Sequence, residues 1–226
     1  MRLLRKGQST LRLTSGLDFA GIVACMNTGL IKFLALACLA GCGGGGDDPG
    51  SGIDPRVARI DAYDMQRLRV LGDAETGVAG MDPTPAVGVP VVGSADFDGF
   101  ATIRVENTAA PLVLYGDSVV TISFAQGSVT GTMDAFFGTN DSGALVDYTG
   151  TITIDAGAVS PDLSFDYAGA LTEGANTLVF DGTLTGMFLG DPLAALAASE
   201  LDAAVYYNGT LVDATFVVVG ETVLSP

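Results

Sequence analysis

The chain has 226 residues, of which 26 are acidic and 10 basic, with no histidine and a formal net charge of −16. So acidic a chain will not bind nucleic acid or an anionic membrane surface through a basic patch. The absence of histidine excludes a Ser-His-Asp triad and removes a preferred ligand of transition metals.

Residues 1–41 have the features of a signal peptide. The apolar run 30–40, broken only by Lys32, is shorter than the about 20 residues of a transmembrane helix and suits the hydrophobic region of a signal peptide. Leu39-Ala40-Gly41-Cys42 follows, and this tetrapeptide resembles the lipobox of bacterial lipoproteins. The resemblance implies cleavage before Cys42, lipidation of its thiol and acylation of the new amino terminus, and more than one chain gives stable anchoring. The alternative is a soluble secreted protein in which this cysteine lies beside the cleavage site by chance.

Met26 opens a compact signal of its own, whereas residues 1–25 add four basic residues and a second apolar patch. We therefore expect translation to start at Met26. Cleavage before Cys42 leaves one cysteine and hence no internal disulfide. It also leaves 25 acidic residues against five arginines, with no lysine. We interpret this acidity as a soluble surface that discourages edge pairing of strands, the alternative being a dedicated cation site.

A tether and a short helix are expected next. Residues 42–53 are rich in glycine and predict a flexible tether with a mean span of about 20 Å. The helix is expected over 54–72, with Asp54 as the N-cap and Pro55 at the first helical position. Its apolar stripe comprises Val57, Ile60, Leu68 and Leu71, interrupted by Asp64. Four of the five remaining arginines lie on this segment; we interpret them as a solvated face, the alternative being a helix that docks against the acidic body behind it.

Residues 73–93 are rich in proline and glycine and predict a loop, and residues 94–226 alternate between apolar and polar side chains. The apolar faces comprise Val120, Ile122, Phe124, Ile152, Ile154, Phe165, Tyr167, Leu171, Leu178, Phe180, Leu184, Phe188, Phe216 and Val218. The pattern indicates about eight one-sided strands, with turns at 140–143 and 208–209. Closure removes strand edges, so we predict an all-β fold, a small up-and-down antiparallel eight-stranded β-barrel.

Two local patterns lie within the barrel region. An aromatic residue, any residue and a glycine recur at 97–99, 148–150, 167–169, 180–182 and 207–209. Residues i and i+2 of a strand share a face, so each ring can cover the gap beside its glycine. We interpret the repeats as core filling, the alternative being an aromatic-lined ligand cavity. The segment DPLAALAASE, residues 191–200, favours a short helix or helical turn between strands.

A series of motifs runs from the lipobox to the C-terminal strands. It comprises the poly-glycine after Cys42, the short polar helix, GSADFDG at 93–99, and then GTMDAFFG, YTGTITI, FDGTLTGMFLG and ASELDAAVYYNG. Together these resemble the transferrin-binding-protein-like lipoproteins of Gram-negative bacteria, whose barrel module also occurs in factor-H-binding proteins. The resemblance implies a lipid-anchored eight-stranded barrel, although the strand 202–205 lacks the family's usual glycine pair. Transferrin binding is not carried over, because no partner-contacting motif matches residue by residue.

The mature chain offers little for catalysis. Without histidine, lysine or a free cysteine, the usual bases and nucleophiles are missing. Asp96 and Asp98 share a strand face as a pair of carboxylates, but alternation also places solvent-facing aspartates at that spacing. The sequence holds no HExxH, CxxC, phosphate loop or calcium loop. We therefore predict no enzyme and no catalytic, cofactor-binding or metal-binding residues, with Cys42 as the one site residue, for lipid.

The expected function is a non-catalytic binding module for a protein or small solute, held at the membrane by lipid on Cys42, with no nucleic-acid partner. The alternatives are a structural envelope lipoprotein and a lipocalin-style carrier of an apolar molecule. Gly43 stands where an inner-membrane retention signal would have aspartate. We therefore expect the outer membrane, at the cell surface rather than its periplasmic face.

Overall fold

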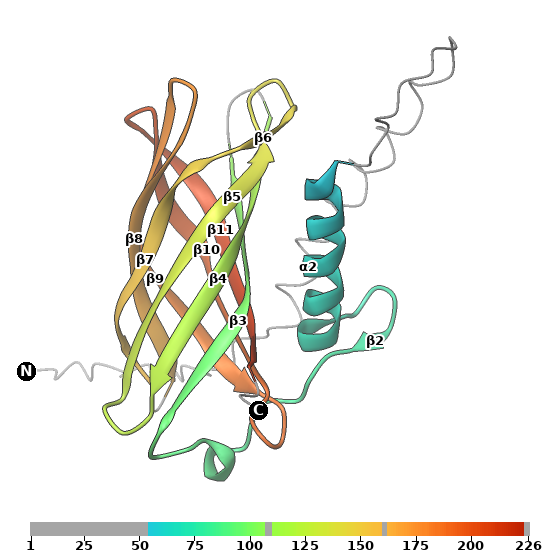
Figure 1. Ribbon diagram of the computed structural model, residues 1–226, viewed down its shortest axis with the longest axis vertical. Helices are drawn as coiled ribbons and strands as arrows, with labels where there is room; N and C mark the ends of the chain where they lie inside the picture. Colours follow the sequence, from blue (N-terminus) through green and yellow to red (C-terminus); the bar gives the residue numbers. More distant parts are fainter. Residues whose placement is uncertain (1–53, 107–109, 160–161, 224–226) are drawn as a thin grey trace, which may run out of the picture. The chain divides into compact units, whose positions relative to one another are not determined.

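The computed structural model describes residues 54–106, 110–159 and 162–223. Within them a single α-helix precedes an all-β body (Figure 1). The N-terminal elements are α2 (Pro55–Leu71), β1 (Gly72–Asp73), β2 (Val78–Ala79) and the 3-10 helix η1 (Ala86–Gly88). The strands of the body are β3 (Ser94–Val105), β4 (Leu112–Ser123), β5 (Ser128–Thr139), β6 (Leu145–Asp147), β7 (Thr149–Ala158), β8 (Leu163–Glu173), β9 (Asn176–Leu189), β10 (Ala195–Tyr207) and β11 (Thr210–Thr222). The predicted signal peptide, Cys42 and the tether lie outside the described residues.

Eight strands close into an antiparallel up-and-down barrel, which confirms the predicted fold class. The eight strands pair in chain order, from β3 with β4 and β4 with β5, then β5 with β7, and so on to β10 with β11. The last strand, β11, returns to pair with β3. The short β6 continues the line of β7 across Tyr148 and pairs with the end of β5. Closure pairs every one of these eight strands on both sides.

The predicted apolar faces point into the barrel. Every residue of the set named above for these faces is buried and belongs to one core cluster. The predicted turn at 208–209 is also confirmed, since Asn208 and Gly209 have φ of 50° and 79°. Two central residues with positive φ are typical of the type I′ turn, whose twist suits a hairpin.

A β-bulge in β5 decides which aromatic side chains enter the core. Ala135 has a φ of 49°, and the register with β4 shifts between Tyr115 and Asp117. The extra residue reverses the alternation beyond it, so Phe136 joins the core while Phe137 lies outside that cluster. Gly116 leaves room for the inward ring, because a Cβ there would lie 2.5 Å from Phe136 Cε1.

The helix predicted for 191–200 is wrong. Residues 190–193 form a turn and β10 begins at Ala195. Three alanines in the first half of this strand, Ala195, Ala197 and Ala198, are buried and paired on both sides, as Ala197 is with Met187 on β9 and Val219 on β11. Helix propensity is a weak preference, and here two neighbouring strands and a closely packed interior override it.

The helix α2 forms where it was predicted, but its arginines are not a solvated face. Asp54 caps it by accepting from the Arg56 backbone N–H, and Gly72 ends it with a φ of 70°. Of the predicted stripe only Ile60 is buried, together with Tyr63 and Val70, whereas Val57, Leu68 and Leu71 are half-buried. These side chains and the arginines dock the helix against the barrel.

The segment 81–93 reaches the end of the barrel where β9 finishes. The Thr84 backbone N–H donates to the Phe188 carbonyl at 2.9 Å, and its hydroxyl donates to the Gly190 carbonyl at 2.7 Å. Val89 packs against the core cluster, while Val91, two residues further on, is 81% exposed.

Candidate functional site

The barrel interior is occupied by aromatic and aliphatic side chains. Phe97, Phe124 and Phe188 form a cluster, with ring centroids of Phe188 at 6.1 Å and 5.9 Å from the other two. Phe216 packs edge-on against Tyr167 at 4.6 Å and against Phe180 at 6.2 Å. The aromatic residues of four of the five aromatic-x-glycine repeats, Phe97, Tyr148, Tyr167 and Phe180, are buried. This packing supports core filling as their role.

One polar pair lies where the pairing of β9 with β10 is interrupted, between Ser199 and Val205. Tyr167, 2% exposed, donates its hydroxyl to Glu200 Oε2 at 2.8 Å, and the Thr183 backbone N–H donates to the same oxygen at 3.1 Å. Gly182 makes this contact feasible, because a Cβ there would lie 2.5 Å from that carboxylate oxygen. Burial and the Glu200 carboxylate both raise the pKa of Tyr167. The pair therefore holds a neutral phenol and satisfies a buried hydroxyl.

The outer wall of β3, β4 and β5 is covered by α2, and we call it the covered wall (Phe100, Tyr115, Asp117 and Phe137). Tyr63 stacks on its three rings, with centroid distances of 5.0 Å to Phe100, 6.4 Å to Tyr115 and 6.3 Å to Phe137. Such stacked pairs stabilise beyond the area they bury. The tyrosine hydroxyl also donates to Asp117 Oδ1.

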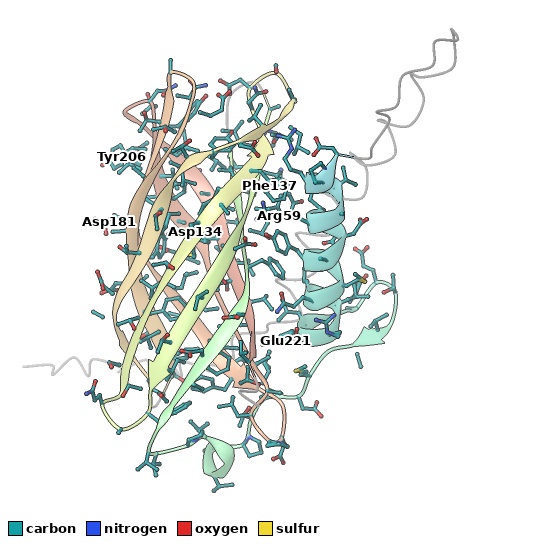
Figure 2. The ribbon with its side chains drawn as sticks, in the orientation of Figure 1. Arg59, Asp134, Phe137, Asp181, Tyr206 and Glu221 are labelled. Carbon is teal, nitrogen blue, oxygen red and sulfur yellow. The ribbon has the colours of Figure 1, made fainter. Side chains whose placement is uncertain are left out.

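Arginines add charge pairing along the same contact. Arg59 lies 3.0 Å from Asp117 Oδ2, and its guanidinium carbon lies 4.6 Å from the Phe137 ring centroid (Figure 2). Towards the ends of α2, Arg56 lies 3.5 Å from Asp147 and Arg69 lies 2.6 Å from Glu221. Each exposed ion pair contributes little to stability, so the aromatic stack is the main attachment of α2. The arginine pairs, spread along the helix, orient it on the wall.

The docked state of Tyr63 predicts a loss of stability in alkali. Burial, and then the Asp117 carboxylate, raise its pKa from 10.0 to about 12. The unfolded chain deprotonates first, so this contribution is complete below pH 10 and is lost as the pH rises towards about 12. Urea unfolding across this interval should show a shallower decline in Tyr63→Phe than in the wild type. The other tyrosines whose pKa is raised are present in both chains and contribute equally to both slopes. Equal slopes would therefore contradict the buried environment assigned to Tyr63.

An exposed apolar row lies on the outer face of β8 to β11, at the end of β11 away from the Glu221 that pairs with Arg69. It comprises Ala170 on β8, Val179 on β9, Tyr206 on β10 and Leu211 on β11, and we call these four residues the apolar row. Ala170 pairs with Val179, and Tyr206 pairs with both Val179 and Leu211, so the four side chains share the outer face. Val179 is 42%, Tyr206 51% and Leu211 57% exposed.

Carboxylates surround this row without a basic residue on the same strands. Asp181 and Asp213 lie two positions from Val179 and Leu211, and both are exposed. Figure 2 shows Asp181 and Tyr206 on the side of the barrel away from α2. All five arginines of residues 54–223 lie on α2 or β3. The strands that carry the apolar row are therefore anionic as well as partly apolar.

The sequence-predicted site residues do not come together. Cys42 lies outside the described residues. Asp96 accepts from the Thr121 hydroxyl at 2.7 Å on the outer face of the barrel, and Asp98 pairs across strands with Glu221. Both are exposed, as expected of solvent-facing aspartates. In the described ranges, no group of three or more His, Cys, Asp or Glu residues is placed to hold a metal ion.

Sequence reasoning missed Tyr63 and the apolar row. The exposed position of Tyr206 could be found from alternation only by first placing the register shift between Glu200 and Ala203.

The geometry defines a closed eight-stranded barrel with one docked helix and one uncovered, partly apolar wall. Neither a scan against protein-family models nor a search of curated proteins finds a match to the chain. Among residues 54–106, 110–159 and 162–223, no helix is both long and apolar enough to span a membrane.

Proposed function

We propose that the protein is a lipid-anchored outer-membrane lipoprotein whose barrel acts as a non-catalytic binding module of the transferrin-binding-protein-like kind, with its ligand held on the outer wall. The observation that carries this proposal is the filled interior. The largest side chains buried in the barrel, among them Tyr167, Phe180 and Phe216, point into its interior and pack against one another. A ligand then has the outside of the barrel as its contact surface.

The filled interior weighs against the lipocalin-style alternative. In a barrel that carries an apolar molecule, inward side chains line a space between them. Here inward rings contact one another, as Phe216 contacts Tyr167 and Phe180. A structural envelope lipoprotein would share this interior, but it gives no reason for an exposed tyrosine and leucine beside each other on adjacent strands.

Protease shaving of intact cells, compared between the wild type and Cys42→Ala, tests this proposal. We expect the wild type to incorporate labelled fatty acid, to sediment with outer membranes and to lose its barrel antigen to protease while a periplasmic marker stays intact. Cys42→Ala should lose the label and leave the membrane fraction, because the thiol is the lipid acceptor. Cys38→Ala, inside the predicted signal peptide, is the matched control and should keep both.

Two results would contradict the proposal. A labelled protein that persists in Cys42→Ala would remove this cysteine as the anchor. Degradation of the wild-type barrel only after the outer membrane is broken would place it on the periplasmic side and favour a structural role.

A further inference from the structure

The apolar row is an unusual surface for the solvent-facing side of a strand. Single exposed apolar residues are common, but here Val179, Tyr206 and Leu211 are cross-strand neighbours on three adjacent strands. Tyrosine is enriched at the centres of binding interfaces, where it combines a large apolar area with a polar tip. The row therefore has the composition of a docking surface.

The covered wall shows what chemistry this barrel binds on its outside. There the chain's own helix inserts Tyr63 among Phe100, Tyr115 and Phe137, and aims Arg59 at Asp117. The occupant of that wall is thus an amphipathic segment with an apolar anchor and basic side chains placed over aspartates. The wall itself supplies rings and a carboxylate.

The uncovered wall offers the same two kinds of feature, an apolar surface and carboxylates. Tyr206 and Leu211 supply the apolar surface, and Asp181 and Asp213 lie on the adjacent outward positions of their sheet. The pairing of Ala204 with Asp213 places that carboxylate beside a small side chain, two positions along the strand from Tyr206. An occupant with apolar and basic side chains complements both features, whereas an acidic occupant is repelled.

We propose that the apolar row, with Asp181 and Asp213, binds a basic amphipathic segment of a partner protein. This inference rests on the proposed binding function and names its surface and the chemistry of its partner. The barrel is closed, so the partner docks through side chains and not as an added strand. A second copy of this chain in a symmetric pair would place aspartates against aspartates, and an anionic lipid surface would face the same repulsion.

Site-specific photo-cross-linking on the full chain in the cells that make it tests this surface. A photoreactive phenylalanine replaces Tyr206 in one chain and Val119 in the control. Val119 lies on β4, is 43% exposed and pairs with Asp98, so it matches the test position in exposure and neighbouring charge. We expect a cross-linked protein from position 206 that is absent from position 119, and the cross-linked peptide, identified by mass spectrometry, should carry net positive charge.

Charge and contact are then tested separately. Leu211→Arg should lower the yield from position 206 by about tenfold, the size of effect typical of an interface centre, while Val119→Arg should leave it unchanged. Raising the salt concentration during irradiation should also lower the yield, because the attraction between exposed charges is screened. A yield that is insensitive to both would contradict the proposal.

Other outcomes overturn the inference in distinguishable ways. Cross-linking to an acidic peptide, to lipid or to a second copy of the chain would replace the proposed partner. A photoreactive residue at Val91, in the segment beyond η1, serves as a third position. Capture of a protein there and none at 206 would leave the binding function standing and sink this surface. Capture at none of the three positions would sink both.

Discussion

Phe216→Ala is expected to lower the free energy of unfolding by about 3–5 kcal/mol, the range for truncating a buried aromatic side chain. Phe216 is 0% exposed and contacts both Tyr167 and Phe180 edge-on. Truncation removes these ring contacts and leaves a cavity that two-sided strand pairing prevents from collapsing. Urea unfolding of the full chain, followed by circular dichroism, measures the change.

Two matched variants separate packing from general sensitivity. Phe216→Leu keeps most of the volume and should cost less than about 1.5 kcal/mol. Val119→Ala, on the outer face, should stay within about 0.5 kcal/mol of the wild type. If Phe216→Ala costs no more than Val119→Ala, the interior is not packed around this ring, and the argument from a filled barrel fails.

Strand alternation was the most informative feature of the sequence. A side-chain period of two is imposed by the backbone itself, so Ile152 and Ile154, or Phe165 and Tyr167, could be assigned to the core without knowledge of the partners of their strands. The barrel followed from the number of such strands and from the need to avoid open edges. These inferences are local or depend on counting, and the structure confirms them.

Register shifts escaped this reasoning because they break the period. Ala135 at a φ of 49° reverses the alternation in β5, so Phe136 enters the core and Phe137 joins the covered wall. Nothing in GTMDAFFG separates these two phenylalanines. Their roles depend on Gly116 of the neighbouring strand, which leaves the space that the Phe136 ring fills. Such a dependence is a property of the pair of strands and not of either alone.

The error at 191–200 has a related cause. Alanine and leucine favour a helix when nothing else competes, but Ala195 and Ala198 lie between β9 and β11, where the small side chains allow close approach. A Cβ at Gly186, the partner of Ala198, would lie 2.1 Å from the carbonyl oxygen of Ala197. The segment is a strand because two neighbouring strands pair with it. Helix propensity depends only on the local sequence and does not include these partners.

The arginines of α2 were located correctly but interpreted wrongly. Their spacing is compatible with solvent or with an acidic wall, and the choice depends on whether the wall offers an apolar anchor. That anchor consists of Phe100, Tyr115 and Phe137, whose outward positions follow from the bulge and from pairing of three strands. The same limitation hid the apolar row, whose members are dispersed in the sequence and adjacent only in the sheet.

Tyr63→Ala is the corresponding test of the covered wall. It removes the ring that stacks on three aromatic side chains and the hydroxyl that donates to Asp117, and should cost about 3 kcal/mol. The loss concerns the attachment of α2 and not the pairing of the barrel strands. Amide hydrogen exchange should therefore accelerate by about two orders of magnitude in Pro55–Leu71, since about 1.4 kcal/mol corresponds to a factor of ten, while the strands away from the helix remain protected.

Two variants on the same helix show whether the ring is the attachment. Tyr63→Phe keeps the stack and loses the hydrogen bond, so it should cost about 1 kcal/mol. Met65→Ala changes a side chain that is 60% exposed and should leave exchange in α2 unaltered. Acceleration in Met65→Ala equal to that in Tyr63→Ala would mean that any substitution on α2 loosens it, and that the ring is not its specific attachment. In that case the covered wall would no longer indicate that the partner of Tyr206 and Leu211 needs an apolar anchor.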